Sequence, residues 1–299
     1  MLAVTILGNN SAIPAFDRHP TSQIVTLNDQ LFLVDCGEGT QMQIARYRIR
    51  RSRINHIFIS HLHGDHYFGL IGLITSMGLL GRDQDLHLYA PALLRPIIEM
   101  QLKVADTTLP FKLHFYALEA GLLVSNHKFE VSCFKVYHRI DCWGFVFKEI
   151  RAPRKINPEK AVLLDIPVAF YDELRQGKDF ITPEGNEILN EEVTFPNVPG
   201  KSYAYSADTL YHESLALHVK GVDLLYHEAT YLKDLSERAA KRFHSTTLQA
   251  ATTALNAGVQ KLILGHFSSK YESLTQFERE AKEIFGNTEV ALEGVTYKA

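Results

Sequence analysis

Hydrophobic positions along the chain form short runs that indicate buried strands, separated by stretches with helical spacing. In the first part of the chain, strands are expected at residues 4–7, 23–27, 31–35 and 54–60. Residues 28–30 separate the second of these strands from the third and predict a hairpin between them. The glycines at 37 and 39 open a predicted helix that runs to about Arg48.

The remainder of the chain repeats strands followed by helices. Further strands are expected near residues 86–89, 112–116, 121–125, 129–137, 142–147, 202–206, 222–226, 260–264 and 288–292. Further helices are expected near residues 67–74, 92–104, 213–219, 232–242, 247–258 and 274–285. The helix at 247–258 starts with a capping-box pattern and has Gly258 as its predicted C-cap. Strand runs followed by helices, repeated twice, favour an α/β sandwich over a doubly wound parallel sheet.

Residues 150–197 break this pattern. Prolines recur, charged residues are dense, and periodicity is poor apart from a short helix expected near 168–174. We interpret this segment, called the arm below, as an insertion into a single domain that spans residues 1–299.

Composition is that of an ordinary globular protein, with 46% hydrophobic and 22% charged residues and a net charge of −3. No window approaches a membrane span, and residues 1–5 lack the features of a signal peptide. The three scattered cysteines suit a reducing compartment, so we expect a cytoplasmic protein with no disulfide framework and no membrane partner.

Two stretches of the chain are strongly basic, although the net charge of the whole chain is negative. Residues 46–53, "RYRIRRSR", hold five arginines in eight positions, and residues 151–155, "RAPRK", hold three more cations. Both can form a local phosphate-binding surface. For the first stretch, a solvated face or a self-association surface that uses arginine is an equal alternative.

The candidate chemistry is concentrated in "HLHGDH", residues 61–66, between a predicted buried strand and a predicted helix. Loops at strand ends are common places for functional side chains. His61 and His63 can converge on one point, while Asp65 and His66 can converge on a second. Because imidazole and carboxylate groups are good zinc ligands, this spacing predicts a metal site.

The remaining ligands are expected after other strands. His138 follows the strand at 129–137, Asp208 follows the strand at 202–206, and His266 follows the strand at 260–264. His227 also follows a strand and is a competitor. The other histidines without this setting are interpreted as surface or core residues: His19, His56, His87, His114, His127, His212 and His218.

These motifs resemble a known family. "HLHGDH", a late His, "SADT" and "GHFSSKY" resemble the metallo-β-lactamase superfamily. "LGNNSAIPA", "TSQIV", "DCGEGTQMQI", "HEAT" and "FHSTTLQAA" narrow the resemblance to RNase Z, the tRNA 3′-processing endonucleases, over nearly the whole chain. The resemblance implies the αββα metallo-β-lactamase sandwich with an inserted arm.

The resemblance also implies roles for individual residues. His61, His63 and His138 would hold one zinc ion, Asp65, His66 and His266 would hold a second, and Asp208 would bridge both. A zinc-activated hydroxide would attack a phosphodiester of precursor tRNA, leaving a 3′-hydroxyl on the tRNA. Asp65 is the expected proton acceptor. His244 is the expected acid for the leaving oxygen, oriented by Glu228.

Members of this family form homodimers, in which the arm of each subunit grips tRNA at the site of the other. Residues 150–197 occupy the place of this arm and are expected to form the tRNA-binding exosite. They depart from the family pattern, because "DIPVAFYDELRQGKDF" lacks the usual Gly-Pro pair. Acidic residues also offset the cations of this stretch: Asp165, Asp172, Glu173 and Asp179 against Arg175 and Lys178.

Three other functions fit part of the pattern. A dinuclear hydrolase of small phosphodiesters or thioesters would use the same seven ligands, but the insertion and the arginine run favour an RNA substrate. A catalytically silent RNA-binding member of the fold would need a broken ligand set, and no ligand is missing. A β-lactamase would replace parts of this set, often with Cys or Asn, and a structural zinc site would use cysteines.

Overall fold

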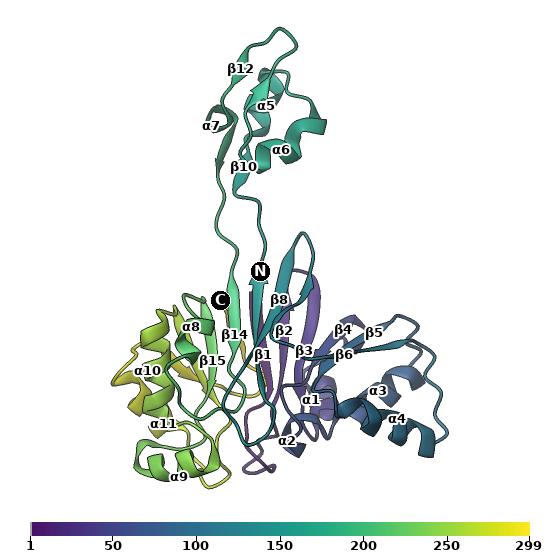
Figure 1. Cartoon of the computed structure of the whole chain (residues 1–299), viewed down its shortest axis with the longest axis vertical. Helices are drawn as coiled ribbons and strands as arrows, with labels where there is room; N and C mark the ends of the chain where they lie inside the picture. Colours follow the sequence, from purple (N-terminus) through teal and green to yellow (C-terminus); the bar gives the residue numbers. More distant parts are fainter. Residues whose placement is uncertain (1) are drawn as a thin grey trace.

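Two seven-stranded sheets packed face to face, with helices on their outer sides, form the body of the molecule (Figure 1). The computed structural model describes residues 2–299. The α/β sandwich predicted from the order of strands and helices is therefore confirmed. Among residues 2–299, no helix is both long enough and apolar enough to cross a membrane.

The first sheet comes from the N-terminal part of the chain and one C-terminal strand, in the order β18-β1-β2-β3-β4-β5-β6. Its strands are β1 (Leu2–Gly8), β2 (Ser22–Leu27), β3 (Gln30–Cys36), β4 (Ile54–Phe58), β5 (Leu86–Ala90), β6 (Leu113–Ala117) and β18 (Thr296–Lys298). The predicted hairpin is present as β2 and β3, and β3 to β6 run parallel. The sequence pattern missed β18, which is too short to show a period.

The second sheet has the order β17-β16-β15-β14-β9-β8-β7. Its strands are β7 (Gly121–Ser125), β8 (Phe129–Lys135), β9 (Trp143–Glu149), β14 (Ser202–Tyr205), β15 (Leu224–Glu228), β16 (Lys261–Gly265) and β17 (Thr288–Val290). Strands β14 to β17 run parallel, and β9 runs antiparallel to both β8 and β14. The carboxyl ends of β8, β14, β15 and β16 therefore lie at the same edge of this sheet.

The helices of the body fall into two sets, one beside each sheet (Figure 1). The set beside the first sheet is α1 (Thr40–Arg46), α2 (Gly64–Tyr67), α3 (Leu70–Leu79) and α4 (Leu94–Val104), with the short 3₁₀ turn η1 (Arg51–Arg53). The set beside the second is α8 (Leu215–His218), α9 (Ser236–Arg242), α10 (Thr247–Ala257) and α11 (Thr275–Lys282), with η3 (Lys233–Leu235). The predicted capping box of α10 is present, and Gly258 ends that helix at a φ of 64°.

An aromatic layer fills the space between the sheets. Phe32 and Phe58 of the first sheet each lie 5.5 Å, between ring centroids, from Phe147 of the second. Helices cover the outer faces, so many strands are apolar on both sides. Leu224 and Leu225 are adjacent in β15, so their side chains point to opposite faces of the sheet, and both are fully buried. Burial on both faces explains the continuous hydrophobic runs in the sequence.

The arm leaves the body as a small separate lobe (Figure 1). It contains β10 (Arg154–Ile156), α5 (Pro158–Leu163), η2 (Val168–Phe170), α6 (Tyr171–Arg175), β11 (Phe180–Ile181), β12 (Glu187–Ile188), α7 (Asn190–Val193) and β13 (Thr194–Pro196). Sequence periodicity indicated only the helical stretch near 168–174, because the other elements are too short to show one. Ile166, Leu174 and Val193 form an apolar cluster inside the arm.

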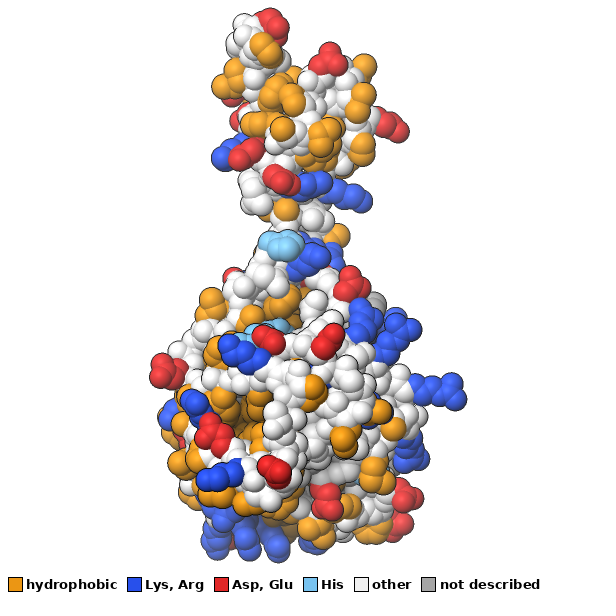
Figure 2. Space-filling model, turned by 90° about the vertical axis from the view of Figure 1, so that its right-hand side faces the viewer, with side chains coloured by type: hydrophobic (Ala, Val, Ile, Leu, Met, Phe, Trp, Pro, Cys, Tyr) orange, Lys and Arg blue, Asp and Glu red, His pale blue; other side chains and the backbone are white. Residues whose placement is uncertain are grey.

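The arm exposes several apolar side chains together with acidic ones. Hydrophobic side chains are spread over it, while Lys and Arg side chains gather near its base (Figure 2). Leu163 and Val168 are 79% and 76% exposed. Exposed apolar surface of this kind indicates contact with another molecule.

The arm and the expected ligands lie at opposite ends of the sandwich. Strand β9 ends at Glu149, where the chain enters the arm, and β14 begins at Ser202, where the chain returns. His138 comes before β9, whereas Asp208 comes after β14. Because β9 and β14 are antiparallel, both residues lie at the end of the sheet away from the arm.

Candidate metal centre

The structure brings all seven predicted ligands together at one end of the sandwich. The HLHGDH loop follows β4, and loops after β8, β14 and β16 supply the other three residues. The side chains form two groups, and within each group the ligand atoms lie within 4.8 Å of one another. One group is His61, His63, His138 and Asp208, and the other is Asp65, His66 and His266.

In the first group, three ring nitrogens face one another. His61 Nε2 and His138 Nε2 lie 3.0 and 3.1 Å from His63 Nδ1. Asp208 Oδ2 lies 3.6 Å from His61 Nε2. Three imidazoles and one carboxylate form a common set for a tetrahedral metal ion.

The second group shares a carboxylate with the first. His266 Nε2 lies 3.3 Å from His66 Nε2 and 3.4 Å from Asp65 Oδ2. Asp208 Oδ2 lies 3.2 Å from His266 Nε2 and 3.5 Å from His66 Nε2. Asp208 thus stands between the two groups.

Neighbouring groups orient the ligand imidazoles by holding the ring nitrogen that faces away from the centre. The Nδ1 atom of His61 lies 3.0 Å from Ser60 Oγ, and that of His66 lies 2.7 Å from Asp35 Oδ2. The Nδ1 atom of His138 lies 2.9 Å from the carbonyl oxygen of Phe243, and that of His266 lies 2.9 Å from Thr230 Oγ1. Such outer partners fix the tautomer and the direction of a metal-binding histidine.

The donor set fits a divalent cation. Asp208 is buried, and its Oδ1 has no hydrogen-bond partner among residues 2–299. Burial lowers the pKa of His61 well below its usual value and lowers the pKa of His63 to about 4, so both rings are neutral. Burial opposes ionisation of Asp65, but His66 and His266 outweigh it and hold its pKa well below the usual range. Neutral His61 and His63 rings beside an ionised Asp65 are the protonation states that zinc requires. At His66, Asp208, Asp65 and Asp35 outweigh burial and raise the pKa well above its usual value, so a bound cation would take the place of the proton on that ring.

Asp35 is a site residue that the sequence analysis missed. It is fully buried in β3, in a left-handed conformation with a φ of 53°. It accepts hydrogen bonds from Ser60 N at 2.7 Å, Ser60 Oγ at 2.8 Å and Tyr205 OH at 2.6 Å. With its contact to His66, it anchors the HLHGDH loop to β3. Its sequence signals are an acidic residue near the end of an apolar strand and its place as the first residue of the "DCGEGTQMQI" motif.

His244 lies beside both groups and pairs with a buried carboxylate. Its Nδ1 is 2.9 Å from Glu228 Oε1. Glu228 also accepts from the backbone amides of Thr209 and Thr230, each at 3.0 Å. Burial disfavours the charged ring, but Glu228 outweighs it and raises the pKa of His244 to about 9. His244 lies within ligand distance of Asp208 and His266, but its Nδ1 is already bonded to Glu228.

His227, the competitor, belongs to neither group of ligands. It is buried in β15, and its Nδ1 donates to the carbonyl of Glu228 at 2.7 Å. Successive side chains of a strand point to opposite faces, so Glu228 faces the site and His227 faces away from it. The sequence could not separate these two faces.

A pocket of about 620 Å³ opens onto the two groups. Its lining includes the ligands His63, Asp65, Asp208 and His266, together with His244. Its lining also includes residues 11–14, Phe68 of the α2–α3 junction, Arg139 and two arginines of α9. The centre is therefore accessible from outside, as a catalytic site must be.

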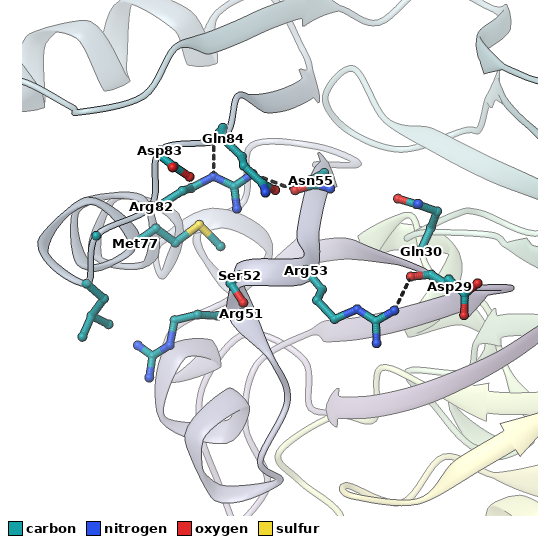
Figure 3. Close-up of a pocket in the computed structure, with 12 residues that line it drawn as sticks. Asp29, Gln30, Arg51, Ser52, Arg53, Asn55, Met77, Arg82, Asp83 and Gln84 are labelled. Carbon is teal, nitrogen blue, oxygen red and sulfur yellow. Dashed lines mark hydrogen bonds between the residues drawn. The ribbon is translucent and has the colours of Figure 1, made fainter.

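The arginine run at 46–53 lies away from this pocket. Arg51 and Arg53 line a different pocket of about 450 Å³, beside the start of β4 (Figure 3). The HLHGDH loop follows the other end of β4. Arg53 donates to the carbonyl of Asp29 at 2.9 Å. None of the five arginines of the run lines the pocket at the metal centre.

The chain is similar in sequence to known proteins. A ribonuclease Z of Bacteroides thetaiotaomicron is 43% identical over 293 residues, covering 97% of this chain and 93% of that protein. A family profile described as Anti-Pycsar protein Apyc1 matches residues 2–148.

Among solved structures, human tRNase Z, short form, superposes with a TM-score of 0.71 at 24% identity, covering 99% of this chain and 98% of that one. The metallo-β-lactamase fold protein YhfI from Bacillus subtilis gives a TM-score of 0.71 at 19% identity, over 100% and 99% of the two chains. These two similarities establish the metallo-β-lactamase fold.

Proposed function

Since the chain belongs to the ribonuclease Z family, we propose that it is an endoribonuclease that removes the 3′ trailer from precursor tRNA in the cytoplasm. The observation that carries this proposal is the complete set of seven His and Asp ligands in a chain 43% identical to a ribonuclease Z over 97% of its length. The complete set argues against a catalytically silent RNA-binding member of the fold.

We propose two zinc ions per subunit as the cofactor. His61, His63 and His138 would hold one, Asp65, His66 and His266 would hold the other, and Asp208 would contribute to both. Zinc would lower the pKa of water and neutralise charge on the phosphoryl oxygens. The all-His/Asp donor set supports zinc over a softer metal that would need thiolates.

We propose that Asp65 orients the attacking water and takes its proton. One oxygen, Oδ2, accepts from the backbone amide of Ala12 at 2.7 Å and lies 3.4 Å from His266 Nε2. These contacts fix the carboxylate in the lining of the pocket. Its depressed pKa, caused by His66 and His266, keeps it ionised and able to accept hydrogen bonds from water.

His244 is the proposed acid for the leaving 3′ oxygen of the tRNA. We expect His244→Ala to lower kcat for precursor tRNA about a hundredfold, because the leaving oxygen would depart without a proton. A substrate with sulfur in place of that 3′ oxygen should restore most of the rate, since a thiolate leaves unprotonated. The exposed His212→Ala serves as the matched control. Equal losses on the oxygen and sulfur substrates would contradict the role.

We further propose that the chain works as a homodimer, in which each arm serves the site of the other subunit. The arm extends from the end of the sandwich opposite to the metal centre, so it points away from its own site (Figure 1). Its exposed apolar side chains and the cations at its base would contact the body of the tRNA. This makes residues 150–197 the proposed tRNA-binding exosite of a single-domain protein.

The decisive experiment is cleavage of a 3′-extended precursor tRNA by the purified protein, with mapping of both product ends. We expect one cut, leaving a 3′-hydroxyl on the tRNA and a 5′-phosphate on the trailer. Removing metal with a chelator should abolish cleavage, and added zinc should restore it. If only a small phosphodiester is cut, the metal chemistry is right and the substrate is wrong.

A further inference from the structure

The pocket above the metal centre has two sides of different chemistry. One side carries cations, Arg238 and Arg242 of α9, and the other carries apolar groups, among them Ile13 and Phe68. Helices α9 and α2 lie apart at the lower end of the body, on either side of the loops that carry the ligands (Figure 1). A strand of RNA entering the pocket would meet both sides at once.

The two arginines are free to bind an anion. They are four residues apart on α9, so their side chains project from the same face of the helix. Both are exposed, and neither forms an ion pair in the described part of the chain. The guanidinium of Arg238 lies 5.7 Å from the ring centroid of Tyr231, another pocket residue. Glu38 is the acidic residue that lines the pocket besides Asp65 and Asp208.

The apolar side presents an aromatic ring beside the ligand loop. Phe68 is 64% exposed although it lies next to buried residues of the centre. A Cβ on Gly64 would come within 2.2 Å of its ring, so the glycine lets Phe68 rest against the HLHGDH loop. Ile13, 56% exposed, lines the same pocket. An exposed ring held in this way is a surface on which a nucleobase can stack.

We propose that Arg238 and Arg242 bind phosphates next to the scissile bond, while Phe68 stacks on an unpaired base at the cleavage point. The inference rests on the proposed function and adds an orientation for the RNA strand, with its backbone along α9 and its bases toward α2. Arginine pairs with phosphate through a planar fork, and aromatic rings take bases of any identity. These contacts of Arg238, Arg242 and Phe68 explain how a chain of net negative charge can hold RNA at its metal centre.

The two sides predict different responses to salt. For the double variant Arg238→Ala/Arg242→Ala, KM for precursor tRNA should rise about tenfold or more, with kcat changed less than about threefold. The slope of log KM against log salt concentration should fall by roughly 1.5 to 2, because two phosphate contacts are lost. Phe68→Ala should raise KM by roughly tenfold and leave the slope as it is, since stacking releases no counterions.

Two further variants control for charge and for folding. Lys241→Ala removes an exposed cation of α9 that does not line the pocket, and its KM and salt slope should match wild type. Arg238→Lys/Arg242→Lys keeps both charges and should restore the wild-type salt slope. All variants should retain the wild-type zinc content, which shows that the centre is intact.

The outcomes separate this inference from the proposed function. If wild type does not cut precursor tRNA, the proposed function fails, and this inference fails with it. If wild type cuts precursor tRNA but the double arginine variant keeps the full salt slope, the phosphate-binding role of Arg238 and Arg242 is refuted and the proposed function stands. An equal fall in slope for Lys241→Ala would refute this role as well, because any cation on α9 would then serve.

Discussion

Replacing Asp208 with Ala is expected to lower kcat/KM for precursor tRNA by a factor on the order of 10³ or more. Its Oδ2 lies within 3.6 Å of ring nitrogens from both ligand groups, at His61, His66 and His266. Its other oxygen is buried without a partner. Without this carboxylate, the site would lose the negative charge that reduces the repulsion between two neighbouring cations.

The measurement pairs cleavage kinetics with metal content for each purified variant. Wild type should hold about two zinc ions per chain, and Asp208→Ala should hold about one or fewer. Asp83→Ala, which removes an exposed acid on the α3–β5 loop, should behave as wild type in both measurements. An Asp208→Ala protein with full zinc content and normal cleavage would remove Asp208 from the site.

Deleting the arm is the second change with a large expected effect. A protein without residues 153–196 should lose precursor cleavage by roughly a hundredfold or more, yet still hydrolyse a small phosphodiester. Asn197 Nδ2 donates to the carbonyl of Ala152 at 2.9 Å, so a short glycine linker can join the two ends. Because the apolar cluster of the arm lies within the arm, the body should stay folded without it.

A mixing experiment tests whether the arm works in trans. The arm-deleted chain has a site but no arm, and the Asp208→Ala chain has an arm but no working site. If each arm serves the partner's site, mixed dimers regain one productive combination, and an equal mixture should reach about a quarter of wild-type activity. A mixture no more active than its two components would show that the arm acts on its own subunit or that no dimer forms.

The local features of this protein are largely predictable from its sequence. The hairpin of β2 and β3 and the capped helix α10 follow from turn residues and capping patterns, which act over a few neighbouring residues. The HLHGDH loop is visible for the same reason, because four candidate ligands lie within six positions. The short elements of the arm are the exception, since two to six residues cannot display a period.

Residues that act across the chain were harder to assign. Asp35 and His66 are 31 positions apart, and only the parallel pairing of β3 with β4 brings them into contact. His227 and Glu228 are adjacent in β15, so their side chains lie on opposite faces of the strand. Only the residue on the face toward the metal centre, Glu228, can contact His244. The hydrophobic pattern of the strand could not distinguish them, because both of its faces are buried.

The sequence by itself determined the fold class and the set of candidate ligands, since strand runs, strand ends and the HLHGDH spacing are local patterns. Tertiary structure alone decided which neighbouring groups hold the ligand rings, as Asp35 holds His66, and that α9 lays Arg238 and Arg242 beside the ligands. It also decided that the arm points away from its own metal centre. The physical reason is the same in each case: parallel and antiparallel pairing sets which strand ends meet, and pairing partners lie far apart in the chain.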